Sequence, residues 1–422
     1  MQTAKMTRTP YASPGVYVEE ANQRSRTIEA ATTSVAAFVG ISAEASRKEI
    51  DPSTGKRQVV ESLLNQVILV TNWAHYVDFF GSFVANTYLT DSIYNYFANG
   101  GGPCYVTSIY AINEAGTAKR PYLNAIDFIG NIQDRTGLKG LEVLDIINLI
   151  ICPDTFYGYD GSNEAVERVK LIQMEMVAHC EQAHFRFALL DTPPGLNVQE
   201  AEAWREEILG FDTTHAALYY PWVEIPNLAG AGTKFIPPSG LIAGIYHRSD
   251  ETYGVHKAPA NEIMRGVVGL EVLVSQEEQG RLNPIGINCI RAFPGLGIRV
   301  WGARTLSRNS AWRYINVRRL FNMIGESLDL GLQWVVFEPN NRLLWAFIRR
   351  DVTVFLRRVW QSGALIGDSQ DEAFYVKIDD EVNPPEIREL GQLIIEIGVA
   401  PVKPAEYIVL RLSQWAGADA ET

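Results

Sequence analysis

The sequence predicts an α/β fold, and three observations lead to it. Strand-like and helical segments alternate between about residues 90 and 225, which is the pattern of an α/β domain. β-prone segments lie near both ends of the chain. The chain has 422 residues, of which 47% are apolar, so it can bury a large core and two or three domains are expected.

The first β-prone segment follows a loose lead-in. In "TPYASPGVYVEE" (Thr9–Glu20), two prolines and a glycine come directly before a short strand-like run. Its predicted strand residues are Val16, Tyr17, Val18 and Glu19. No neighbouring strand is predicted beside it, so this strand needs another sheet to join.

The following segments supply the predicted body. Residues 28–40 are predicted to form a strand of small residues closing at Gly40, and residues 41–58 a polar loop. The alternating segments after them are, in order, a helix (Asp91–Ala98), a strand (Cys104–Tyr110), a buried strand within Val143–Cys152, a helix (Asn163–Phe185) and the strands in "RFALLDTPP" and "HAALYYPWV".

The second half is more helical. The segment Ser239–Glu262 is rich in glycine and has no clear period, and strand-like halves flank Pro294–Gly297. A helix follows that carries Leu320, Ile324 and Leu328 on one face. The clearest helix is "NNRLLWAFIRRDVTVFLRRVWQSG", which Gly363 ends. Its apolar stripe consists of Leu344, Ile348, Val352, Phe355 and Val359.

The end of the chain mirrors its beginning. One alternating strand is predicted around Leu393–Ile397, then a proline break, then a second strand that includes Ile408, Val409, Leu410 and Arg411. The predicted organisation is an N-terminal arm (1–27), an α/β region (28–290), a C-terminal domain (291–395) and a C-terminal arm (396–422).

Charge limits the classes of partner. The net charge of −12 disfavours nucleic acid, which needs a basic surface. The stretch from Arg291 to Trp360 is different, with 12 arginines, no lysine and four acids. Arginine without lysine favours fixed pairing with carboxylates, either inside the fold or on a partner.

Metal, membrane and nucleotide sites are not predicted. The four cysteines show no metal-ligand spacing and are predicted to be buried free thiols. His179 and His184 are five residues apart, which is the wrong spacing for a helical metal pair. No apolar run reaches the ~20 residues of a membrane span, and "MQTAKMTRTP" lacks the apolar core of a secretory signal. The glycines of Ala98–Pro103 follow a helix and precede a strand, which is the reverse of a phosphate loop.

One cluster leaves an enzyme as the alternative. His247, Asp250 and His256 surround a predicted turn, and a hydrolase-like site could be built there. No nucleophile in a G-x-S-x-G context accompanies them, so a catalytic role is not favoured.

Eight short motifs, taken in order, resemble one family. The motifs are "SPGVYVEE", "FANGGGPCYV", "LEVLDIINLIICPD", "LYYPWV", "PPSGLIAGIY" with "GVHKAPAN", "WGARTLS", "YINVRRLF" and "GVAPVKPAEYIVLRL". Together they are similar to the contractile tail sheath proteins of myophages, R-type tailocins and extracellular contractile injection systems, over essentially the whole chain.

The resemblance implies a structural protein that is not an enzyme and has no cofactor. It implies a subunit that polymerises helically around an inner tube and contracts to drive the tube through a target envelope. The N- and C-terminal arms would pair with sheets of neighbouring subunits. The implied partners are other copies, the inner tube protein and baseplate and terminal cap proteins, with no direct nucleic acid or membrane insertion. Assembly would occur in the bacterial cytoplasm, as part of a phage tail or a phage-tail-like particle that can be released.

The resemblance gives the arginines a second interpretation. Arg318, Arg319, Arg350 and Arg357 lie on the two long C-terminal helices and are candidates to face the tube. The alternative is that they pair with the acidic stretch Asp368–Glu389 of the same subunit.

Overall fold

A computed structural model describes residues 27–409 and 411, except 52, 54–56, 114–119 and 121. The predicted strand at Val16–Glu19 and the residue Leu410 lie outside the described residues. No helix in the described part of the chain is both long and apolar enough to span a membrane.

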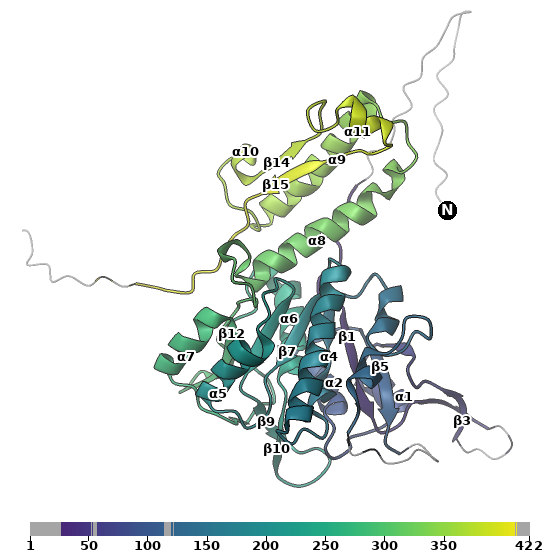
Figure 1. The fold of residues 1–422 in the computed structure, drawn as a ribbon, viewed down its shortest axis with the longest axis vertical. Coiled ribbons are helices and arrows are strands. Elements are labelled where there is room, and N and C mark those ends of the chain that lie inside the picture. Colours follow the sequence, from purple (N-terminus) through teal and green to yellow (C-terminus); the bar gives the residue numbers. More distant parts are fainter. Residues whose placement is uncertain are drawn as a thin grey trace, which may run out of the picture.

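An eight-stranded sheet forms the centre of the larger body (Figure 1). Its strands, from edge to edge, are β13 (Gly297–Val300), β12 (Ile287–Phe293), β8 (Ala216–Tyr220), β7 (Phe187–Asp191), β6 (Leu149–Ile151), β1 (Ala36–Ser42), β5 (Cys104–Ala111) and β4 (Val67–Val70). The six inner strands are parallel, and β4 and β13 run antiparallel to their neighbours at the edges. The predicted α/β class is therefore confirmed.

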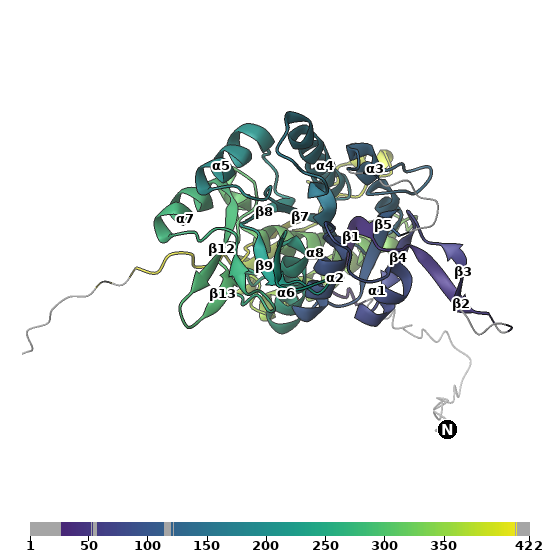
Figure 2. The same cartoon turned by 90° about the horizontal axis from the view of Figure 1, so that it is seen from below.

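Helices cover both faces of this sheet, as Figure 2 shows. One face is covered by α3 (Ala125–Ile129), α4 (Asn163–Gln182), α5 (Val198–Ala203) and α7 (Gln276–Leu282), and the other by α1 (Trp73–Phe80), α2 (Leu89–Ala98) and α6 (Ser239–Tyr253). Each face has its own apolar core, which explains why the inner strands are apolar on both sides. All four cysteines are buried and free, as predicted.

Helix α6 was not predicted from the sequence, and its glycines explain why. Gly240 and Gly244 lower the helix propensity of the segment, yet both face α2 at close range. A Cβ at Gly244 would lie 2.4 Å from the backbone oxygen of Tyr96. The glycines therefore allow the two helices to pack with their backbones in near contact.

Two predictions near the N-terminus are corrected. The predicted strand at 28–40 begins only at Ala36, because the residues before it run along helix α8 (Ile315–Leu332), where the Ala31 amide donates to Ser327 Oγ at 2.8 Å. The predicted polar loop at 41–58 contains most of a hairpin of β2 (Ser46–Ile50) and β3 (Arg57–Ser62). Most side chains of this hairpin are exposed, so its sequence lacks the alternation of a half-buried strand.

A smaller sheet is formed by β9 (Val223–Pro226), β10 (Thr233–Ile236) and β11 (Gly269–Leu270).

A smaller helical unit stands above the sheet body (Figure 1). It contains α8, α9 (Arg342–Gln361), α10 (Gln370–Ala373), β14 (Phe374–Lys377), α11 (Pro385–Glu389) and β15 (Glu396–Val399), which surround a third apolar core. The expected division after residue 290 cuts through β12, which pairs with β8, so the sheet body extends to Val300. The expected division after residue 395 separates β15 from its partner β14, so residues 396–399 belong to the helical unit.

Candidate subunit interface

The sheet of β14 and β15 presents two open edges. The strands pair antiparallel from Phe374 opposite Val399 to Lys377 opposite Glu396. One face packs on the apolar stripe of α9. Among the described residues, neither strand has a partner on its outer edge. A two-stranded sheet is marginal by itself, and an open edge is a template for a further strand.

The chain after β15 leaves the helical unit and runs away from the body (Figure 1). Asn316 Nδ2 donates to the Val402 carbonyl at 3.1 Å, and Arg304 forms a salt bridge with Glu406. Beyond this anchor Tyr407, Ile408 and Val409 are 72, 82 and 78% exposed. Three exposed apolar side chains in an extended segment favour contact with another surface. The sequence predicted an arm strand at residues 408–411 but did not predict the Arg304–Glu406 salt bridge that anchors it. The only sign of this salt bridge in the sequence is the single carboxylate of the "PAEY" motif, and nothing in the sequence indicates its partner.

Two of the four candidate tube-facing arginines have partners within the subunit, and one of them is buried. The side chain of Arg319 is 3% exposed and donates to Asp250 and to the Thr33 carbonyl. The Arg318 guanidinium lies 3.9 Å from the ring centre of Trp312 and 3.1 Å from His215 Nε2. Burial lowers the pKa of Arg318 to about 10. Arg319 is thus unavailable to an outside partner, and Arg318 is largely committed to its own chain.

The other two candidates, Arg350 and Arg357, are exposed on α9. Arg350 Nε lies 3.0 Å from Oδ1 of the buried Asp351, and Arg357 Nη2 donates to Gln370 Oε1 at 2.9 Å. In the described residues neither forms a salt bridge with the acidic stretch Asp368–Glu389. Arg342 does so instead, through Asp380 at 2.7 Å. These two arginines therefore remain candidates for an external partner.

The histidine cluster does not assemble a hydrolase-like site. His247 Nδ1 lies 2.9 Å from the hydroxyl of Ser34, which is only 6% exposed. The Asp250 carboxylate, which would have to orient a catalytic histidine, instead bonds to Arg319 and to Thr33 Oγ1. No group of metal-binding side chains occurs in the part of the chain that the structure describes.

Two family models match the chain continuously from residue 144 to residue 414. Residues 144–306 match the phage tail sheath protein central domain, and residues 307–414 match the phage tail sheath C-terminal domain.

The chain belongs to the phage tail sheath family.

Solved sheath structures extend this similarity to nearly the full length. The anti-feeding prophage helical sheath in its contracted state is 32% identical, with a TM-score of 0.71, over 95% of this chain and 99% of that chain. The contracted sheath complex of the PVC extracellular contractile injection system is 30% identical, with a TM-score of 0.72, over 97 and 99%. The predicted sheath fold and family are thus confirmed.

Sequence relatives include phage and prophage sheaths. The tail sheath protein of Burkholderia phage BcepMu is 29% identical over 67% of this chain. The putative prophage major tail sheath protein of Pseudomonas aeruginosa is 24% identical over 52% of this chain. The matched chain spans 60 and 55% of the length of these two relatives.

Proposed function

We propose that this chain is the sheath subunit of a contractile injection particle, with a structural and mechanical role and no catalytic one. It polymerises helically around an inner tube and contracts to drive the tube through a target envelope. Other copies, the inner tube protein, baseplate proteins and a terminal cap protein are its partners. Assembly takes place in the bacterial cytoplasm.

The main support for this proposal is that the outer edges of β14 and β15 are open among the described residues. They occur in the same subunit as two β-prone arms, one at Val16–Glu19 and one at Ile408–Arg411. An arm that joins the sheet of the next copy makes a contact between two different surfaces, and such contacts propagate into helical assemblies. The identities of 30 and 32% to injection-system sheaths, which extend over 97 and 95% of this chain, favour that class of particle.

Contraction is proposed to occur by rigid-body movement, with the arms acting as hinges. Each subunit body has three separate apolar cores and would stay intact while neighbouring bodies slide. No nucleotide is needed, because the extended assembly stores the energy in its interfaces.

Truncation of the arms tests the proposal. Deletion of residues 1–22, or of residues 408–422, should leave a folded subunit that no longer forms tubes or sheaths in negative-stain images. The second deletion keeps all of β15 and the Arg304–Glu406 pair, whereas a cut after Gly398 would remove Val399 at the end of β15 and also Glu406. The proposed function would be contradicted if the full-length protein, co-expressed with its tube protein, formed only small discrete particles. The role of the arms would be contradicted if either truncated protein formed long sheaths.

A further inference from the structure

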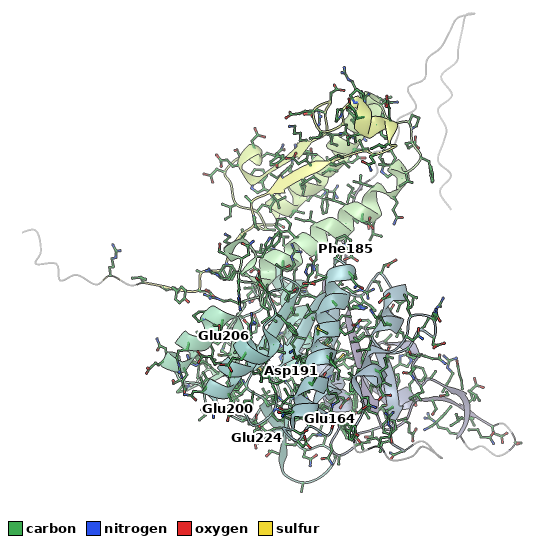
Figure 3. All side chains as sticks on the ribbon, in the orientation of Figure 1. Glu164, Phe185, Asp191, Glu200, Glu206 and Glu224 are labelled. Atoms are coloured by element: carbon green, nitrogen blue, oxygen red, sulfur yellow. The ribbon has the colours of Figure 1, made fainter. Side chains whose placement is uncertain are left out.

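A cavity rich in arginine lies on the sheet body, away from β14, β15 and α9. It lies between the π-helix η3 (Trp204–Leu209), which directly follows α5, the turn at 283–286 and the loop at 304–313. Figure 3 labels Glu206 of η3 on this side of the body. The cavity has a volume of about 180 Å³, whereas one water molecule occupies roughly 30 Å³ in the liquid.

Arg205 supplies a buried donor that has no partner. The residue is 3% exposed, and its Nε and Nη2 donate to the carbonyls of Ile285 and Leu306 at 3.0 and 2.9 Å. These bonds fix the guanidinium in place. Its Nη1 is buried without a hydrogen-bond partner among the described residues. A buried unsatisfied donor is costly, more so when it belongs to a charged group, so its retention calls for an explanation.

The remaining lining is strongly positive. Four arginines line the cavity, and Glu206 is the one acidic residue among its described lining residues. Arg304 is neutralised by Glu406, whereas Arg205, Arg308 and Arg313 form no salt bridge in the part of the chain described. Burial lowers the pKa of Arg205, and the nearby charge of Arg308 lowers it further, while Glu206 and Asp212 partly oppose this. An anion in the cavity would relieve this repulsion.

A carboxylate already occupies the neighbouring position. Both oxygens of Glu406 accept hydrogen bonds from Arg304, another of the lining residues. In this pair, a carboxylate with two acceptor oxygens faces the fixed donors of an arginine. An oxyanion bound in the cavity would meet Arg205, Arg308 and Arg313 in the same way.

We propose that this cavity is an oxyanion-binding site, with Arg205 Nη1 as its buried donor and Arg308 and Arg313 as its accessible donors. The oxyanion is either a small solute such as inorganic phosphate or a carboxylate that a neighbouring copy presents in the assembled sheath. Both would present negatively charged oxygens to the same arginine donors, and the two parts of the experiment below distinguish between them. The site does not depend on the proposed sheath function.

The first arm of the test uses the purified full-length protein and inorganic phosphate. Calorimetric titration at constant ionic strength should show saturable binding to one site. The double variant Arg308→Gln with Arg313→Gln should weaken it at least about tenfold, because each lost charge-assisted hydrogen bond is worth a factor of roughly ten or more. A matched control is Arg342→Gln with Arg357→Gln, which removes the same charge from exposed positions on α9 and should leave binding unchanged.

The second arm uses sheath from native particles. If the source is a neighbouring copy, a high-resolution map should place a carboxylate within hydrogen-bond distance of Arg205 Nη1 or Arg308, and the free subunit need not bind phosphate. Arg205→Lys should then weaken assembly while the isolated subunit stays folded by circular dichroism. The proposal is overturned if the free protein does not bind phosphate and the assembled cavity holds no oxyanion, or if the control variant loses as much affinity as the double variant.

Discussion

Arg304 and Glu406 form a two-pronged salt bridge across 102 residues of sequence, with Nε to Oε1 at 2.9 Å and Nη2 to Oε2 at 2.6 Å. Their side chains are only 8 and 14% exposed, and Tyr314 donates a further hydrogen bond to the same carboxylate. The pairing raises the pKa of Arg304. Burial alone would raise the pKa of Glu406, but its contacts with Arg304 and Tyr314 together outweigh burial and lower it. The pair thus holds the start of the C-terminal arm on the sheet body.

The first prediction is that Glu406→Gln releases this arm. Loss of a charge-assisted pair of roughly 1–2 kcal/mol should make chymotryptic cleavage after Tyr407 about tenfold faster, because cleavage requires local detachment. Glu396→Gln is the control, since it changes an exposed carboxylate that bonds only to Tyr375 among the described residues. Equal cleavage rates in both variants would show that the pair does not anchor the arm.

The second prediction concerns Asp191, which Figure 3 labels in the body of the sheet domain. Its Oδ1 accepts the amide of Ser239 at the start of α6 at 2.9 Å. Burial raises its pKa to about 7 from 3.8. Between these values the folded protein holds a proton that the unfolded chain has lost, so this group's stabilising contribution decreases as pH rises, by at most roughly 1.4 kcal/mol per pH unit.

Asp191→Asn removes this titration. Melting curves of both proteins from pH 4 to pH 8 should therefore show the wild type losing stability relative to the variant as pH rises towards 7, with no further change above it. Comparison of the two proteins cancels the titration of the other buried acids, among them Asp91, Asp154 and Glu326, whose pKa values burial also raises. A constant difference in melting temperature across this range would show that Asp191 does not titrate there.

The third prediction tests the contact of α6 with α2. Gly244→Ala would place a Cβ against the Tyr96 backbone oxygen, and overpacking of this kind costs about 1–3 kcal/mol. Gly280→Ala in α7 is the matched control, because a Cβ there would have no atom within 4 Å apart from its chain neighbours and its own helix backbone, and alanine favours a helix by roughly 1 kcal/mol. The first variant should melt at a lower temperature than the wild type and the second at an equal or higher one. The opposite order would mean that the helices can separate without cost.

The sequence predicted the elements that have a clear hydrophobic periodicity or that are long. The helix within 163–185, the strand at 104–110 and the long helix after Asn341 were predicted close to their observed bounds. Helix α6 was missed because its glycines serve packing with α2 rather than local propensity. The burial of Arg319 could not be predicted either, since Asp250 lies 69 residues earlier in the chain and only the fold brings the two together.

The last prediction tests whether the exposed side of α9, where the candidate arginines lie, contacts the inner tube. Arg357 is the better test residue, because its bonds run to the neutral amide of Gln370. Charge reversal at Arg350 would instead set a carboxylate beside the buried Asp351 and disturb the fold itself. Arg357→Glu should therefore leave the melting temperature almost unchanged, since exposed charge pairs are worth about 0–1 kcal/mol. If α9 lines the lumen, the same variant should assemble poorly on tubes or contract early. The reason is that the weak ion pair between this arginine and a carboxylate of the tube protein would be lost in every subunit of every ring. Arg57→Glu, which makes the same change on the exposed hairpin strand β3, should assemble as the wild type does. Normal assembly of Arg357→Glu on tubes, measured by electron microscopy, would exclude this arginine from the tube contact.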